Sequence, residues 1–257
     1  MTHSPTELTH IERYEIKYLL PERRVPEVRA MIKPLCVLDE HARADGSYPI
    51  RSHYLDTDHF DLFLANEREQ RDRFKARIRS YPGTSAPVFL EIKRRVGDVI
   101  VKSRASLKEG QWQRAFLDPA EAARTGKKGV VEFVNRVHRY HLRPRLMVEY
   151  DREAYESTID DYARVTFDRR IVCQVKETLG NQVDPRRWRH VDHPAQTRTL
   201  ENICVLELKF ERRPPRWMNN IIQRLDLVRM SFSKYCYGVA SQLLFPTVRT
   251  PAMLGGF

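Results

Sequence analysis

The sequence predicts an α+β fold in which about eight antiparallel strands form the centre and helices lie around them. Two observations support this prediction. Eight segments are rich in β-branched and aromatic residues and are bounded by turn signals such as Tyr81-Pro82-Gly83. Most of them are joined by short turns, with the helical patterns segregated around them. Eight strands can close into an antiparallel β-barrel with flanking helices, which removes the sheet edges, and an open sheet packed on helices is the alternative.

The expected strands follow one another along the whole chain. Their approximate ranges are 11–19, 47–56, 72–81, 87–95, 98–106, 145–155, 163–169 and 203–211. We expect a single domain over 1–257, with its core at about 11–245 and loose ends at 1–10 and 246–257. Segment 171–202 is polar and irregular, so a loop or insertion is expected there.

Four helices are expected from apolar stripes with helical spacing. In residues 22–35, Val25, Val28 and Ile32 fall on one face, and residues 129–141 repeat this pattern. A C-terminal helical pair is expected over 215–227 and 231–244.

Composition favours an anionic partner. The chain has 45 basic and 34 acidic residues, a net charge of +11. The four cysteines are widely spaced without a Cys-x-x-Cys pair, which argues against a zinc site or a disulfide framework. The sequence shows no long apolar run and no signal-peptide pattern, so we expect a soluble, cytoplasmic protein.

One expected strand, RFKARIRS at residues 73–80, carries a cation at every second position. Arg73, Lys75, Arg77 and Arg79 alternate with apolar residues. Since successive side chains of a strand point to opposite faces, one face would be a row of positive charges and the other would be core. A solvated outer face is the ordinary interpretation of such alternation. A face directed at an anion is the other one.

The same spacing recurs in four further strands. It appears in RYEIK at 13–17, FLEIKRR at 89–95, VIVKSRAS at 99–106 and ICVLELKF at 203–210. Charges in apolar strands are costly unless they are paired or face water or a charged ligand. We therefore expect one shared, mostly cationic interior. Glu15, Glu91 and Glu207 lie in phase with the cations, and either ion pairing or coordination of a hard divalent ion explains them.

An ordered set of motifs resembles a known family. The set includes RYEIK, SHYLDT at 52–57, KARIRSY at 75–81, FLEIKRR, VKSR at 101–104, EYDREAY at 149–155, RVTFDRR at 164–170, LELKF at 206–210 and FSKY at 232–235. Together these motifs are similar to the VTC domain, the polyphosphate polymerase of vacuolar transporter chaperone complexes and its bacterial relatives. That domain is a triphosphate tunnel metalloenzyme, in the superfamily that includes the CYTH-type triphosphatases.

The resemblance implies an eight-stranded antiparallel tunnel with a basic lumen. It implies an ATP:polyphosphate phosphotransferase that moves the ATP γ-phosphate onto a growing polyphosphate chain, releases ADP and requires Mn²⁺ or Mg²⁺. The partners would be ATP and polyphosphate. Fungal relatives couple synthesis to membrane translocation, so a separately encoded membrane protein is a further expected partner. Nucleic acid is not expected, because the aromatic residues mostly alternate away from the charged faces.

The matching motifs carry over ten site residues. The catalytic set implied by the resemblance is Lys17, Arg77, Arg79 and Lys234. The phosphate-binding set is Lys93, Lys102, Arg152, Arg164 and Lys209, and the metal ligand is Glu207. Asp56 and Asp168, which end strands, are expected to cap a helix or pair with arginine.

The chain departs from the family pattern in two places. Many tunnel enzymes begin with Glu-x-Glu-x-Lys, but the first position here is Arg13. One fewer carboxylate suits the polymerase branch better than a two-metal triphosphatase. A second basic position holds Asn66, with Arg68 nearby as a candidate ligand. A tunnel triphosphatase and a non-catalytic sensor of polyphosphate or nucleotide are the alternative functions.

Overall fold

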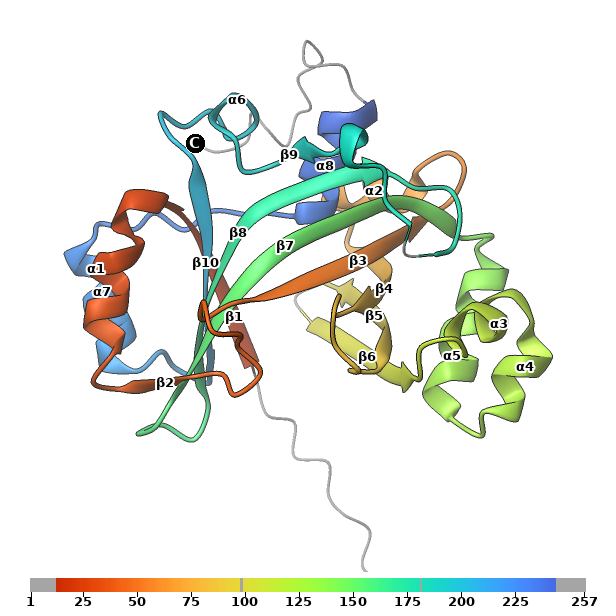
Figure 1. Ribbon diagram of the computed structural model, residues 1–257, viewed down its shortest axis with the longest axis horizontal. Coiled ribbons are helices and arrows are strands. Elements are labelled where there is room, and N and C mark those ends of the chain that lie inside the picture. Colours follow the sequence, from red (N-terminus) through yellow and green to blue (C-terminus); the bar gives the residue numbers. More distant parts are fainter. Residues whose placement is uncertain (1–12, 98, 181, 244–257) are drawn as a thin grey trace, which may run out of the picture.

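The computed structural model describes residues 13–97, 99–180 and 182–243. Its centre is one antiparallel sheet with strand order β1-β10-β8-β7-β3-β4-β5-β6, and β2 and β9 pair with β7 and β8 (Figure 1). The strands are β1 (Arg13–Pro21), β2 (Cys36–Leu38), β3 (Tyr48–Asp56), β4 (Asp72–Ser80), β5 (Val88–Val96), β6 (Val99–Leu107), β7 (Arg143–Ser157), β8 (Ala163–Val175), β9 (Arg189–His190) and β10 (Ile203–Glu211).

Helices cover the two flanks of the sheet and one end of it. In Figure 1, α1 and α7 lie beside β1 and β10, α3 to α5 lie beyond β6, and α8 lies at the top over β7 and β8. The helices are α1 (Val25–Ile32), α2 (Asp61–Glu67), α3 (Trp112–Leu117), α4 (Pro119–Arg124), α5 (Lys128–Arg139), α6 (Pro194–Thr197), α7 (Arg216–Arg224) and α8 (Lys234–Leu243), with 3-10 turns η1 (Glu22–Arg24) and η2 (Pro185–Arg187).

The structure confirms the α+β class and the antiparallel eight-strand sheet. The main path has eight strands, and within the described residues its two ends, β1 and β6, do not pair with each other. The sheet is therefore a curled half-barrel rather than one closed by hydrogen bonds. The expected ends 1–10 and 246–257 lie outside the described residues.

The prediction of a loop or insertion over 171–202 is wrong in its first part, since β8 continues to Val175. Arg170 has a left-handed backbone with φ 51°, and the register between β7 and β8 shifts between Glu149 and Asp151. Such a bulge reverses which side chains face the core, so the alternation read from the first half of β8 does not continue. Beyond it, η2, β9 and α6 add short elements to this segment.

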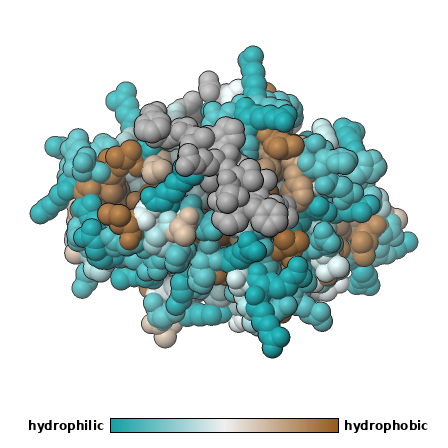
Figure 2. Space-filling model, turned by 90° about the horizontal axis from the view of Figure 1, so that it is seen from above, coloured by the Kyte–Doolittle hydropathy of each residue, from teal (hydrophilic) through white to brown (hydrophobic). Residues whose placement is uncertain are grey.

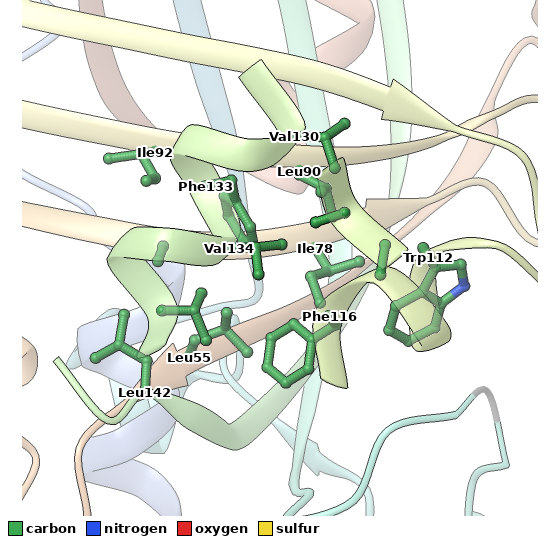
Figure 3. Packing of buried hydrophobic residues seen from close by; sticks show 14 of the residues in the cluster. Leu55, Ile78, Leu90, Ile92, Trp112, Phe116, Val130, Phe133, Val134 and Leu142 are labelled. Atoms are coloured by element: carbon green, nitrogen blue, oxygen red, sulfur yellow. The ribbon is translucent and has the colours of Figure 1, made fainter. Parts of the chain in front are cut away.

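Buried apolar side chains form separate clusters on the two sides of the sheet. Figure 3 shows the cluster beneath α3 to α5, where Leu90 and Ile78 of the strands meet Phe133 and Trp112. A second cluster joins α1 and α7 to β1, β8 and β10. Both lie on the outer, convex side of the curl. Seen from above, the described surface is mostly hydrophilic, with brown apolar patches between (Figure 2).

The third cluster places α8 on the concave side of the curl. Tyr235 and Val239 of α8 pack with Tyr54, Leu146 and Tyr150 of β3 and β7. The approach is close at Gly238, where an added Cβ would lie 2.6 Å from Leu146 Cδ2. Apolar packing by α8 thus covers one end of the concave face and leaves the other end to the charged side chains.

Candidate functional site

The cationic row of β4 lies on the concave face of the sheet, as predicted from the recurrence of the same spacing in five strands. Its apolar partners Phe74, Ala76 and Ile78 are buried in the outer cluster beneath α3 to α5. Arg77 and Arg79 extend from the opposite face and lie within 4 Å of Glu91 on β5. This row is therefore an inward-facing one and not a solvated outer face.

Charged faces from opposite ends of the sheet meet across the concave side. Glu15 is on β1, the first strand of the path, and Lys93 is on β5, the last but one, yet Nζ of Lys93 lies 4.0 Å from Oε2 of Glu15. The segment before α8 crosses the same space. Lys17 Nζ donates to the Phe232 carbonyl at 3.3 Å, and Lys75 Nζ donates to Ser233 Oγ at 2.9 Å. We call this convergent set of charged side chains on the concave face the passage.

Glu207 of β10 is the acidic centre of one wall of the passage. Its side chain is 5% exposed and lies among four cations. Lys209 Nζ is 2.8 Å away, Lys17 and Arg152 are each 3.3 Å away, and Lys234 is 3.7 Å away. A buried carboxylate surrounded in this way is held ionised, because burial raises its pKa but the lysines and the arginine lower it well below the usual range.

Asp168 of β8 ties two of these cations together. Nε and Nη2 of Arg152 donate to its two oxygens at 2.7 Å, and Lys234 Nζ donates to Oδ2 at 2.5 Å. The expectation that Asp168 pairs with arginine is confirmed. The same holds for the helix-capping role of Asp56, which accepts hydrogen bonds from the backbone N–H groups of Leu62 and Phe63 at the start of α2.

Glu91 of β5 is the acidic centre of the other wall. Arg77 Nε donates to its Oε2 at 2.7 Å, Arg79 Nε lies 3.6 Å away, and Lys102 and Arg104 lie 3.5 Å from Oε1. Burial raises the pKa of Glu91, but Arg77, Arg79 and Lys102 together lower it far below its usual range. Arg79 Nε and Glu91 Oε1 are nonetheless buried without a hydrogen-bond partner in the described part of the chain.

Between these two centres, the carboxylates of the passage do not fully neutralise the positive charge of the lysines. Burial lowers the pKa of Lys93 and of Lys102, and neighbouring cations lower it further, while Glu15 and Glu91 act in the opposite direction. Lysines whose charged form is destabilised in the free protein gain from a bound anion. The electrostatics of the passage therefore favour an anionic ligand.

The pKa of Glu15 leads to a testable pH dependence. Burial and Glu207 raise this pKa, but Lys17, Lys209 and Lys93 lower it to about 2, from 4.5 for an ordinary glutamate. A depressed folded-state pKa contributes stability that is present above the unfolded value and is lost as the pH falls through the folded value. We expect Glu15→Gln to lower the free energy of unfolding by about 1–2 kcal/mol at pH 7 after solvent screening, and by much less near pH 2.

Urea unfolding of wild type and Glu15→Gln at both pH values measures this difference. Glu40→Gln, at an exposed site outside the passage, is the matched control and should show no pH-dependent difference. A stability gap between wild type and Glu15→Gln that is the same at pH 7 and pH 2 would contradict the assignment.

The structure groups most of the residues named from the sequence. Lys17, Arg152, Lys209 and Lys234 surround Glu207, while Arg77, Arg79 and Lys102 surround Glu91, and Lys93 lies between the two groups. Arg164 differs. It is on the same face of β8 as Thr166 and Asp168, but it is 45% exposed and pairs with Glu156. Arg68 is exposed at the end of α2.

Several residues of the passage were not assigned a role from the sequence. The two-residue alternation places Lys75 and Arg104 on this face, although neither was named as a site residue. Tyr54 had no such signal. Its hydroxyl accepts a hydrogen bond from Arg77 at 3.2 Å and its ring stacks on Tyr235 of α8, so its place depends on tertiary packing.

The described residues contain no group of three or more His, Cys, Asp or Glu side chains arranged to bind a metal ion. They do offer two ionised carboxylates close together, Glu207 and Glu15, with Lys17 Nζ within 3.3 Å of both. Magnesium in phosphate-binding enzymes commonly takes one or two carboxylates, and phosphate oxygens and water complete its shell. This donor set fits such an ion when a phosphate ligand is bound.

A separate hollow of about 990 Å³ lies between α1 and α7, away from the passage. Met31, Leu35, Trp217 and Ile221 are among the residues that line it. Its lining is largely apolar and lacks the convergent cations of the passage. The hollow between α1 and α7 therefore does not share the basic character of the concave face.

Comparisons with known proteins agree with the resemblance in the motifs. The VTC domain family model matches residues 12–243. Subunit 4 of the vacuolar transporter chaperone complex from Schizosaccharomyces pombe is 29% identical to the chain over an alignment of 274 residues. That alignment covers 89% of this chain and 37% of the relative, so the chain spans little more than a third of the relative's length.

Two solved structures are also similar to the chain. One is a Bacillus halodurans protein provisionally named as an adenylate cyclase, with a TM-score of 0.49 and 13% identity over 85% of this chain and 92% of that one. The other is PH1819 from Pyrococcus horikoshii OT3, with a TM-score of 0.38 and 12% identity over 83% and 86%. Both scores are low, so the fold is described from the chain's own strands.

Proposed function

The chain belongs to the VTC domain family, and on that premise we propose that it is a polyphosphate polymerase that transfers the γ-phosphoryl group of ATP to a growing polyphosphate chain. The observation that carries this proposal is the passage itself. Cations from six strands and α8 converge on one concave face, and they outnumber the carboxylates among them. An extended polyanion is the ligand whose charge such a surface complements.

Arginines and lysines have different roles in this proposal. Arg77 and Arg79 bind phosphoryl oxygens of the triphosphate through their planar guanidinium groups, which suit two-point contacts. Arg152 has two of its nitrogens on Asp168, so it positions that carboxylate as well as adding charge. Lys17, Lys93, Lys102, Lys209 and Lys234 add positive charge along the passage, and Arg164 adds it at the rim.

Transfer between phosphates needs positioning and charge neutralisation rather than a general base. A terminal oxygen of the polyphosphate chain, already ionised, attacks the γ-phosphorus and forms a new P–O bond. The bond from the γ-phosphorus to the bridging oxygen breaks, and ADP leaves with that oxygen. Glu207 and Glu91 have pKa values far below the usual range, so they are poor proton acceptors. A hydrolase must activate water, which this set of carboxylates is badly suited to do.

A divalent ion, Mn²⁺ or Mg²⁺, would be held by Glu207 with Glu15 beside it. When bound, it would neutralise charge on the phosphate oxygens. Lys17 contacts both carboxylates, so it holds them in place and would share their charge with the ion.

The test is incubation of purified protein with ATP and Mn²⁺ or Mg²⁺, followed by ³¹P NMR. We expect internal polyphosphate resonances to grow in step with ADP. Inorganic phosphate without polymer would contradict the polymerase proposal and favour a triphosphatase. Tight polyphosphate binding with no turnover would contradict it too and favour a sensor.

The assembly in which the chain works is part of the proposal. The curated relative is named as a complex subunit. Within the described residues, no helix has the length and apolar character needed to cross a bilayer. We propose that a separately encoded membrane protein is a partner of this chain. A cytoplasmic location stays a prediction.

A further inference from the structure

Two neighbouring residues at the start of α8 reach different parts of the sheet. Lys234 Nζ lies 2.5 Å from Oδ2 of Asp168 and 3.7 Å from Oε1 of Glu207, beside β8 and β10. The next residue, Tyr235, is buried and reaches the end of β3, where its hydroxyl donates a hydrogen bond to Oδ2 of Asp56. Successive residues of a helix are about 100° apart around its axis, so one turn of α8 contacts both regions.

Asp56 is a firmly held acceptor for this hydroxyl. It is fully buried, and its oxygens also accept hydrogen bonds from the backbone N–H groups of Thr57, Leu62 and Phe63. Burial and the neighbouring Asp56 raise the pKa of Tyr235 far above its ordinary value, so the hydroxyl stays protonated and able to donate. The bond therefore joins the first turn of α8 to the end of β3 and the start of α2.

The ring of Tyr235 is held independently of its hydroxyl. It stacks on Tyr54 with 4.9 Å between the ring centroids, and Phe63 meets it edge-on at 6.4 Å. Farther along the helix, Gly238 approaches Leu146 closely. These apolar contacts keep α8 on the sheet, whereas the hydroxyl adds a directional contact that sets the position of the first turn.

The segment just before α8 is held by side chains that a phosphate ligand would attract. Lys17 Nζ donates to the Phe232 carbonyl at 3.3 Å, and Lys75 Nζ donates to Ser233 Oγ at 2.9 Å. Ammonium groups bind phosphate oxygens more strongly than neutral oxygens, so a bound anion competes for both lysines. These two contacts are therefore weakened when phosphates bind.

The bond between Tyr235 and Asp56 does not face this competition. Both residues are buried, and neither carries a positive charge that would attract a phosphate. We propose that Tyr235 is a positioning residue for phosphoryl transfer, because its hydroxyl fixes the first turn of α8 and thereby keeps Lys234 beside Glu207 while phosphates are bound. This inference rests on the proposed function, and it gives a role to a side chain that acts through Lys234 rather than on the phosphates.

The test is Tyr235→Phe, which keeps the ring stack and removes only the hydroxyl. We expect kcat for polyphosphate synthesis to fall about ten-fold while KM for ATP stays within about two-fold, because the phosphate-binding cations are all retained.

The matched control is Tyr155→Phe. Tyr155 also donates its hydroxyl to a buried carboxylate, at 2.7 Å from Glu153 Oε1, and also packs edge-on against an aromatic ring, but it lies outside the passage. Its replacement should cost comparable stability and leave kcat within about two-fold of wild type.

Acetylation of Lys234 supplies a readout that needs no substrate. Burial lowers the pKa of Lys234, but Asp168 and Glu207 raise it above its ordinary value, so the buried ammonium should react slowly in wild type. In Tyr235→Phe we expect the labelling rate of Lys234 to rise at least about five-fold, at a temperature at which every variant is folded, because the first turn of α8 opens more readily. In Tyr155→Phe the rate should stay at the wild-type value.

Unchanged labelling of Lys234 in Tyr235→Phe would overturn the positioning role, and so would faster labelling with a normal kcat. Equal losses of kcat and Tm in both variants, or a loss seen only as a higher KM, would overturn it too. If wild type made no polyphosphate, the proposed function would fail, and the labelling rates would still decide whether Tyr235 positions Lys234.

Discussion

Replacing Glu207 with glutamine should lower ATP-dependent polyphosphate synthesis by at least about 100-fold, since it removes the carboxylate on which four cations converge and which would hold the proposed divalent ion. Glutamine keeps the shape of the side chain but not its charge. Lys209 then loses its partner at 2.8 Å, while Asp168 and Glu15 still compensate their own neighbours.

Stability should change together with activity. Breaking a buried ion pair by removing one partner costs about 3–5 kcal/mol, so the Tm of Glu207→Gln should fall. Tripolyphosphate should still bind, because the cations remain, and should raise the Tm of the variant more than that of wild type. Loss of activity with retained tripolyphosphate binding thus separates a role in turnover from simple unfolding.

The control for this variant is Glu156→Gln. Glu156 is an exposed carboxylate on the same concave face, at the rim, and it pairs with Arg164. Its replacement should leave synthesis within about three-fold of wild type. Near-normal turnover by Glu207→Gln would refute the central role of this carboxylate.

Replacing Arg77 with lysine should lower kcat/KM for ATP by about 100-fold, or about 2.7 kcal/mol of transition-state stabilisation. The positive charge remains, but the planar group that donates to Glu91 at 2.7 Å and to the Tyr54 hydroxyl at 3.2 Å is lost. Lysine offers a point charge on a flexible stem, which cannot make the same two-point contact with a phosphoryl group.

Steady-state kinetics on Arg77→Lys and Arg164→Lys check this prediction. Arg164 is the matched control, because it lies on the same concave face but at the exposed rim, where its exchange should cost less than about five-fold. Equal effects at both positions would mean that charge alone matters and that guanidinium geometry at Arg77 does not.

The sequence predicts which face of the sheet the charged side chains occupy, because successive side chains of a strand point strictly to opposite faces. Once Phe74, Ala76 and Ile78 are assigned to the core, their neighbours Lys75, Arg77 and Arg79 must share the other face. Alternation predicts on which face of the sheet a side chain lies, but not how deeply it is buried there. Arg164 is on the predicted face, yet it lies at the rim, since its position along β8 depends on register with β7 and β10.

The individual partner of each charged side chain was beyond the sequence pattern. That Asp168 pairs with Arg152 in particular, or that Tyr54 orients Arg77, depends on the register between neighbouring strands, β7 with β8 and β3 with β4. The short helices α2, α3 and α4 have six or seven residues, too few for a helical period to stand out. The bulge at Arg170 hid the second half of β8 in the same way.

The central claim is that an extended polyanion binds inside the passage, and lysine footprinting tests it most directly. Acetylation requires a neutral amine, so Lys93 and Lys102, with lowered pKa values and about half-exposed side chains, should react readily in the free protein. Polyphosphate should protect both of them, and leave the outward Lys108 and Lys128 unprotected. Protection of Lys108 and Lys128 with no protection of Lys93 and Lys102 would place the polyanion on the outer surface and contradict the account.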